Sequence, residues 1–94
     1  MRLTQQQASL IASRIRQYFG TNARVWLFGS RVDDKRKGGD VDLYVEPEHT
    51  DLDSEMKCRM NLEDELDLHV DLVISRAGRD EPIYRIAKRE GVRL

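Results

Sequence analysis

Apolar positions near the N-terminus recur at intervals of three and four residues, the spacing of one face of a helix. They run from Ala8 to Phe19, and Gly20 ends the pattern. Thr4 and Gln7 stand just before it, three positions apart, which is the spacing of a capping box. We therefore expect an amphipathic helix that begins after Thr4 and ends before Gly20.

Three later segments have the composition or the alternation of β-strands. Residues 24–28 are β-branched and aromatic, which favours a short buried strand. Residues 40–46 alternate strictly between polar and apolar side chains until Pro47 ends the run. Residues 68–74 alternate in the same way, with leucine, valine and isoleucine on one face. Residues 31–39 are charged, contain two glycines and are expected to form a surface loop.

Two more helices complete the predicted elements. Thr50 or Asp51 can cap a helix that extends to about Leu66. Pro82 suits the first turn of a final helix, and Gly91 ends it. The order helix, strand, strand, helix, strand, helix predicts an α/β (α+β) fold, a small mixed sheet with helices packed on one side.

Length and composition exclude several classes of protein. The 94 residues allow one small core, so we expect a single domain over residues 1–94. With 39 % hydrophobic and 35 % charged residues, the chain is neither disordered nor collagen-like nor a coiled coil. No apolar stretch approaches the roughly 18 residues of a membrane span, which predicts a cytoplasmic protein without membrane contact. One cysteine and two histidines provide no zinc cluster, so a metal would need oxygen ligands.

The net charge of −1 hides a pattern along the chain. Residues 1–39 carry a net charge of +6, residues 40–71 carry −10 and residues 72–94 carry +3. A charge run usually marks a solvated face, and part of the acidic segment belongs to the second predicted helix. Other aspartates of this segment interrupt apolar strands, which makes it the first place to look for a functional site.

Three aspartates lie in the predicted strands. Asp40 and Asp42 share one strand face, within reach of a common divalent cation, although two solvated surface aspartates are the commoner interpretation of such a pair. Asp71 interrupts the most apolar strand, where a carboxylate is costly to bury unless it binds a metal or a partner. The turn at Gly29 and Ser30 presents backbone N–H groups suited to phosphate. Together these features favour a two-metal nucleotidyl-transfer site.

A resemblance to a known family rests on three segments: Leu27-Phe28-Gly29-Ser30-Arg31, Gly39-Asp40-Val41-Asp42-Leu43 and Val70-Asp71-Leu72-Val73. They resemble the DNA polymerase β nucleotidyltransferase superfamily, and within it the minimal nucleotidyltransferases. In element order the resemblance covers residues 1–94. It implies that Gly29 and Ser30 hold the nucleotide's β and γ phosphates. It also implies that Asp40 and Asp42 bind two magnesium ions (Mg2+), while Asp71 binds the catalytic metal and helps to activate the incoming hydroxyl.

Three neighbouring residues keep two interpretations each. Arg31 follows the Gly-Ser pair, where the resemblance implies nucleotide binding through paired hydrogen bonds to the triphosphate. A solvated loop arginine explains it equally well. Tyr44 shares the expected face of Asp42 and is either next to the substrate or packed in the core. His69 shares the face of Asp71, but a lone strand histidine is more often a satisfied neighbour than a ligand, so we leave it out of the predicted site.

The resemblance also implies a reaction and a partner. Minimal members resemble antitoxins encoded beside a HEPN-domain RNase toxin, whose tyrosine they modify with AMP taken from ATP. It therefore implies a magnesium-dependent adenylyltransferase with ATP as substrate and a HEPN toxin as partner. Two alternatives are an antitoxin that acts by contact alone and transfer to a small molecule. The apolar stripe of the second helix, with Met56, Cys58 and Met60, supplies either part of a partner surface or simply core. Direct nucleic-acid binding is not expected, because the aromatic residues form no exposed stacking platform in a basic face.

Overall fold

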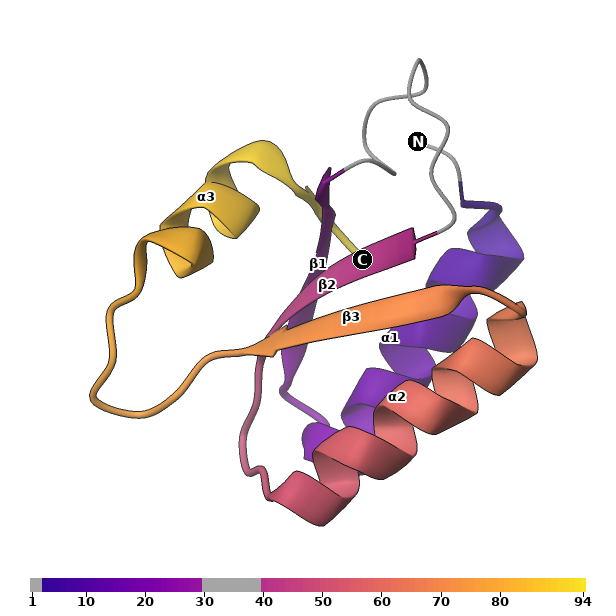
Figure 1. Ribbon diagram of the computed structural model, residues 1–94, viewed down its shortest axis with the longest axis horizontal. Coiled ribbons are helices and arrows are strands. Elements are labelled where there is room, and N and C mark those ends of the chain that lie inside the picture. Colours follow the sequence, from indigo (N-terminus) through magenta and orange to yellow (C-terminus); the bar gives the residue numbers. More distant parts are fainter. Residues whose placement is uncertain (1–2, 30–39) are drawn as a thin grey trace.

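The computed structural model describes residues 3–29 and 40–94, except for the side chain of Asp40. In chain order the elements are α1 (Gln5–Phe19), β1 (Arg24–Phe28), β2 (Asp40–Glu46), α2 (Leu52–Leu66), β3 (His69–Ile74), α3 (Pro82–Glu90) and β4 (Val92–Arg93) (Figure 1). The first six confirm the predicted types and order. The sequence does not predict β4, since two residues carry no readable alternation. The predicted loop 31–39 lies outside the described residues.

The ends of the first two helices follow the predicted capping chemistry. Thr4 Oγ1 accepts a hydrogen bond from the Gln7 N–H at 3.0 Å, and Gln7 Oε1 accepts one from the Thr4 N–H at 2.9 Å. Of the two predicted caps of α2, Asp51 is the one found, because its carboxylate accepts from the Ser54 N–H at 2.7 Å. In the part of the chain that the structure describes, no helix is long and apolar enough to cross a membrane.

The four strands form one mixed sheet in the order β3-β2-β1-β4. β1 is antiparallel to both β2 and β4, whereas β2 and β3 are parallel. A parallel pair needs a crossover, and α2 supplies it. The register places Asp42 on β2 opposite Phe28 on β1 and also opposite Asp71 on β3. Three strands therefore bring these residues to the same level of the sheet.

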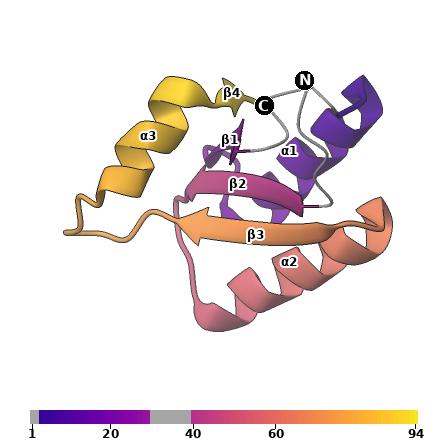
Figure 2. The ribbon, with the colours of Figure 1, turned by 45° about the horizontal axis from the view of Figure 1, so that its top comes forward.

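One face of the sheet is covered by α1 and α2, whose apolar side chains share a core cluster with the strands. In Figure 1 α1 passes behind β3 and α2 runs below that strand, and Figure 2 shows α2 and α3 on opposite sides of β2 and β3. The cluster between them contains a free cysteine, Cys58, on α2. Burial raises the pKa of this thiol to about 12, so Cys58 is a packing residue and not a nucleophile. The remaining members are Leu3, Ile11, Ile15, Phe19, Val25, Leu27, Val41, Leu43, Val45, Leu62, Leu66, Val70 and Ile74.

The third helix, α3, packs on the opposite face. Its residues Tyr84 and Ala87 form a second cluster with Trp26 and Tyr44. The ring centroids of Tyr44 and Tyr84 lie 5.3 Å apart, and those of Trp26 and Tyr44 lie 5.5 Å apart. The expectation of helices on one side thus holds for α1 and α2 but not for α3. The physical reason is that strand alternation turns Trp26 and Tyr44 to the second face, where large rings also need cover.

Candidate active site

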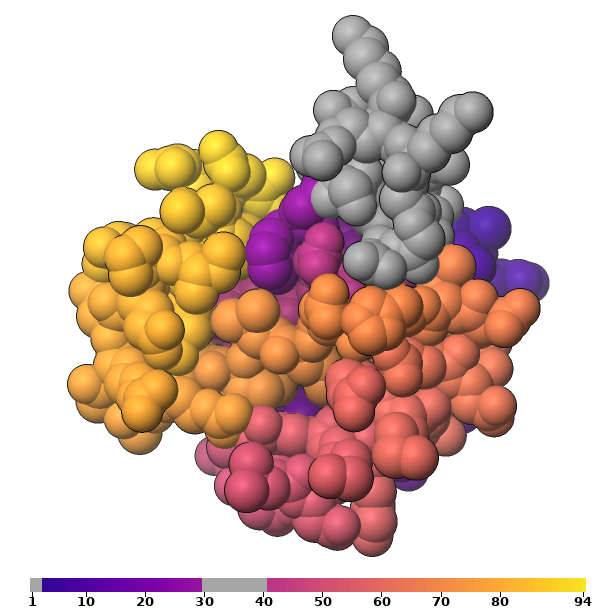
Figure 3. All heavy atoms as spheres, in the orientation of Figure 1, coloured from indigo at the N-terminus to yellow at the C-terminus, as the bar shows by residue number. Residues whose placement is uncertain are grey.

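The helix α3 covers the half of the second face that carries the aromatic rings. The other half is formed by the end of β1, by Asp42 on β2 and by Asp71 on β3. In Figure 3, purple and magenta atoms of β1 and β2 reach the surface between α3 in yellow and β3 in orange. Asp42 is half-buried and the Asp71 side chain is 53 % exposed, so both carboxylates are within reach of a ligand.

Asp42 and Asp71 are direct neighbours across the parallel pair β2 and β3. Like charges that face each other across a strand pair repel, unless a cation lies between them or near them. Carboxylate oxygens are also the ligands that Mg2+ prefers, so the donor chemistry of this pair suits that ion. The structure thus brings together two of the three carboxylates in the predicted metal-binding set.

Gly29 lies directly against the carboxylate of Asp42. Its φ of 78° falls in the left-handed region, which L-residues with a side chain rarely adopt. A Cβ atom built on Gly29 would also collide with the Asp42 Oδ2 atom. Both observations require glycine here, for backbone conformation and for space. The turn predicted to hold phosphate is therefore adjacent to a carboxylate predicted to hold metal.

Three predicted site residues are only partly described or not described. Ser30 and Arg31 lie outside the described residues, so their predicted roles in phosphate binding stay predictions. Asp40 begins β2 opposite His69 in the register, and its side chain is not described. Within residues 3–29 and 40–94, no group of three metal-ligating side chains comes together. The two described carboxylates of the predicted set, those of Asp42 and Asp71, do lie side by side in register.

His69, which sequence reasoning leaves out of the site, contacts Asp71. Its Nε2 atom lies 3.1 Å from Asp71 Oδ1, and its Nδ1 atom lies 2.9 Å from Glu63 Oε2. Glu63 also accepts a hydrogen bond from the Val70 N–H at 2.9 Å, and this bond is the main reason that its pKa is lowered. Strand alternation places His69 beside Asp71, but nothing in the sequence indicates that Glu63 on α2 contacts the His69 ring.

Tyr44 belongs to the core and not to the substrate side. Its side chain is 1 % exposed, and burial raises the pKa of its hydroxyl to about 12. The hydroxyl donates to Glu46 at 2.9 Å, and Arg24 and Lys88 pair with the same carboxylate at 2.7 and 3.0 Å. Partial burial alone would raise the pKa of Glu46, but the hydrogen bonds from Lys88 and Tyr44 and the charge of Arg24 keep it below its ordinary value.

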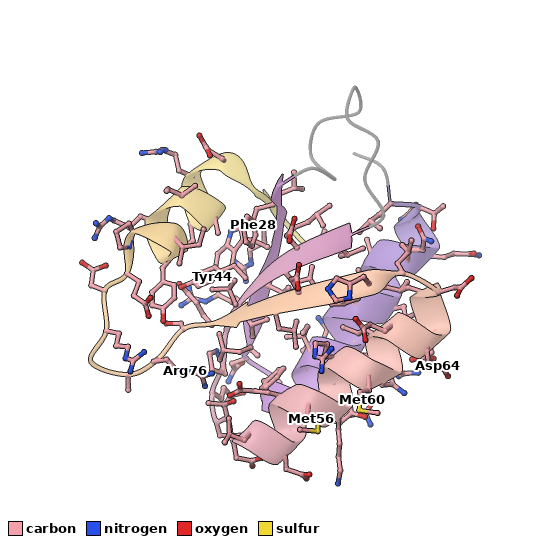
Figure 4. The ribbon with its side chains drawn as sticks, in the orientation of Figure 1. Phe28, Tyr44, Met56, Met60, Asp64 and Arg76 are labelled. Carbon is pink, nitrogen blue, oxygen red and sulfur yellow. The ribbon has the colours of Figure 1, made fainter. Side chains whose placement is uncertain are left out.

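Met56 and Met60 are surface residues, not core. They are 56 % and 57 % exposed and project from the outer side of α2 (Figure 4). Together with the exposed Leu52 they form an apolar strip, and a groove of about 280 Å³ runs from this strip to Leu72 on β3. Such a strip on a small protein is typical of a contact surface for another molecule.

Comparison with known proteins identifies a matching family and several solved structures with a similar fold. The sequence profile of the family described as "Polymerase beta, Nucleotidyltransferase" matches residues 13–94. A comparison with curated proteins found no match.

Three solved structures of toxin–antitoxin complexes contain a similar chain. One is the tri-AMPylated HEPN toxin of Shewanella oneidensis with its MNT antitoxin: TM-score 0.73, 22 % identity, 97 % of this chain and 71 % of the other covered. The second is an MntA–HpeT complex with a tyrosine-to-alanine variant: TM-score 0.71, 23 % identity, 92 % and 68 % covered. The third is the same complex with two aspartates changed to glutamate: TM-score 0.73, 20 % identity, 92 % and 70 % covered. At these identities the likeness shows a shared fold.

Proposed function

This chain belongs to the polymerase beta nucleotidyltransferase family, and we propose that it transfers AMP from ATP to a tyrosine hydroxyl of a HEPN-domain toxin encoded beside it. The observation that carries the proposal is the contact of Gly29 with the Asp42 carboxylate, next to Asp71 on the neighbouring strand. A phosphate-binding turn and a metal-binding carboxylate must be adjacent for phosphoryl chemistry. The similar structures are toxin–antitoxin complexes, one of them a tri-AMPylated HEPN toxin with its MNT antitoxin, and they support the choice of acceptor.

The proposal gives each candidate residue a role. Asp40, Asp42 and Asp71 would hold two Mg2+ ions, which when bound neutralise the charge that develops on the phosphates. The backbone N–H groups and hydroxyl at Gly29 and Ser30 bind the β and γ phosphates. Arg31 adds a guanidinium to the same triphosphate.

In the proposed transfer one bond to phosphorus forms and one breaks. The tyrosine oxygen forms a bond to the α-phosphorus of ATP, the bond from that phosphorus to the bridging oxygen breaks, and pyrophosphate leaves. Asp71 accepts the proton of the hydroxyl. Its exposed position on β3 allows a side chain from another protein to approach.

A second candidate, an antitoxin that acts by contact alone, is favoured by one observation. The exposed strip of Leu52, Met56 and Met60 offers apolar area to a partner without any need for the aspartates. In this alternative the carboxylates are relics, and binding alone neutralises the toxin.

The test is the intact mass of the neighbouring HEPN protein after incubation with this chain, ATP and magnesium. We expect added adenylate masses with the wild type and none with the double variant Asp40→Asn, Asp42→Asn, because the metal ligands are lost. Asp53→Asn on α2, exposed and away from the site, is the matched control and should transfer normally. Replacing the partner's modified tyrosine with phenylalanine should abolish the modification. A tight complex with no added mass would favour contact alone.

A further inference from the structure

The imidazole ring of His69 lies between two carboxylates. Its Nε2 atom is 3.1 Å from Asp71 Oδ1 and its Nδ1 atom is 2.9 Å from Glu63 Oε2. A histidine ring carries a proton on at least one nitrogen and on both when charged, so it can donate to one or both of these oxygens. The ring thus links α2, where Glu63 lies, to the third predicted metal ligand on β3.

Glu63 is itself held in place from two further directions. Its Oε2 atom accepts the Val70 N–H at 2.9 Å, and its Oε1 atom lies 3.4 Å from Arg59 Nη1. The Val70 contact is to the backbone of β3, so Glu63 is held against the strand that carries both His69 and Asp71. This series of contacts runs from Arg59 through Glu63 and His69 to Asp71, and each residue orients the next.

This chain of contacts contributes little to folding. The His69 side chain is 55 % exposed and that of Asp71 is 53 % exposed. Ion pairs and hydrogen bonds at such exposure contribute about 0 to 1 kcal/mol, because water competes and side-chain entropy opposes them. The arrangement is therefore better explained by the orientation that it gives to Asp71.

We propose that His69, fixed by Glu63, is a positioning residue for Asp71. By engaging Oδ1 it fixes the carboxylate rotamer and leaves Oδ2 for the metal ion or the incoming hydroxyl, as partners of metal-ligating side chains commonly do. The inference rests on the proposed function for its chemistry, but it concerns the geometry of Asp71 and can be tested without an acceptor protein.

The experiment compares three substitutions of His69 that separate its two contacts. The amide of His69→Gln can replace the Nε2 donor to Asp71, whereas that of His69→Asn replaces only the Nδ1 donor to Glu63. His69→Ala removes both. The control is His49→Ala, the other histidine, which is exposed and lies at the far end of the sheet.

Two readouts are followed beside the urea-unfolding free energy. The first is Mn2+ affinity, measured from free-ion electron paramagnetic resonance in the presence of α,β-methylene-ATP. The second is kcat and KM for AMP transfer. We expect a loss of about 10- to 100-fold in Mn2+ affinity or kcat for His69→Ala and His69→Asn. His69→Gln should recover most of it, and KM for the acceptor should change little.

The results separate this inference from the proposed function. Wild-type Mn2+ affinity and kcat in His69→Ala, or equal losses in His69→Gln and His69→Asn, would overturn the positioning role. A wild type that binds Mn2+ but modifies no HEPN protein would instead overturn the proposed function, and the Mn2+ comparison would still decide the role of His69.

Discussion

The second face of the sheet has two halves built from the same strands. On β2, Asp42 and Tyr44 stand two residues apart and so share one face. Tyr44 is covered by α3 and is 1 % exposed, whereas the Asp71 side chain beside Asp42 is 53 % exposed. The strand pattern is the same in both halves, so among the described residues it is the position of α3 that distinguishes the packed half from the exposed half.

The covered half is held by packing and by hydrogen bonds that close its outer end. Tyr84 stacks on Tyr44, and its hydroxyl donates to Glu81 at 2.9 Å. Lys88 on α3 pairs with Glu46 at 3.0 Å, which ties the helix to the far end of β2. We expect residues of this half to determine stability and residues of the open half to determine the rate of transfer.

The largest effect on AMP transfer, with little effect on stability, should come from Asp71→Asn in the open half. Asparagine keeps an oxygen that accepts from His69 but loses the charge that binds metal and takes the proton. We expect transfer to fall by roughly 1000-fold or more, since several kcal/mol of transition-state stabilisation depend on such ligands. The urea-unfolding free energy should change by less than about 1 kcal/mol, because the side chain is half-exposed. A comparable loss of stability would show that the open half also supports the fold.

Tyr84→Ala makes the converse test in the covered half. It removes a buried ring from the contact with Tyr44 and should cost about 3 kcal/mol in unfolding free energy, the usual range for large-to-small changes in a core. Urea unfolding at low temperature measures this loss. Transfer per folded molecule should stay within about threefold of wild type. Tyr84→Phe, which keeps the ring and loses only the hydroxyl, should cost about 1 kcal/mol.

Gly29→Ala, a change in the open half, should have an intermediate effect, mainly on kcat. Gly29 and Gly78 have φ values of 78° and 79°, so alanine at either site meets the same backbone strain, about 1 kcal/mol. Only at Gly29 does the new Cβ meet the Asp42 carboxylate, whereas Gly78 has open space around it. We expect Gly29→Ala to lose at least about tenfold in kcat and Gly78→Ala to retain it. Gly29→Ala should also have the lower unfolding free energy of the two, because its Cβ displaces the Asp42 carboxylate. Equal kcat values would refute the importance of this contact.

Sequence reasoning predicts the elements that form both halves, but not which half is covered by a helix and which is exposed. Periodicity and caps locate six elements, because each is long enough to show its pattern. Alternation also predicts that Asp42 and Asp71 share a face. It does not say which helix covers that face, since this depends on tertiary packing, and so α3 is expected on the wrong side.

Side-chain contacts between different elements are not predicted either, because they too depend on tertiary packing. The link from Glu63 to His69 joins a helix to the following strand, and no local spacing encodes it. The loose apolar stripe of α2 has a similar ambiguity: Cys58 is buried while Met56 and Met60 are exposed, although all three are apolar. A weak helical pattern does not distinguish core from contact surface.

The smallest expected effect concerns the segment that leads from β3 to α3. Glu55 on α2 pairs with Arg76 through both carboxylate oxygens, including a 2.8 Å contact from Nη2 to Oε1, and the Arg76 N–H donates to the Tyr84 hydroxyl at 3.3 Å. The hydrogen bond from Arg76 lowers the pKa of Glu55 below its ordinary value of 4.5. A lowered pKa in the folded state means that the pair stabilises the fold above that ordinary value and ceases to do so as the pH falls through the folded pKa.

Glu55→Gln should therefore lower the unfolding free energy by about 1 kcal/mol at pH 7, because the pair is only partly buried. The difference from wild type should shrink as the pH falls below about 4.5, because the Glu55 carboxyl takes up a proton first in the unfolded chain and, at lower pH, in the folded protein. Urea unfolding of both proteins at a series of pH values measures this. kcat at pH 7 should be unchanged, since Glu55 is hydrogen-bonded to Arg76 and Thr50, which have no role in the proposed transfer. A difference that persists undiminished in acid would assign the loss to packing of the side chain and not to its charge.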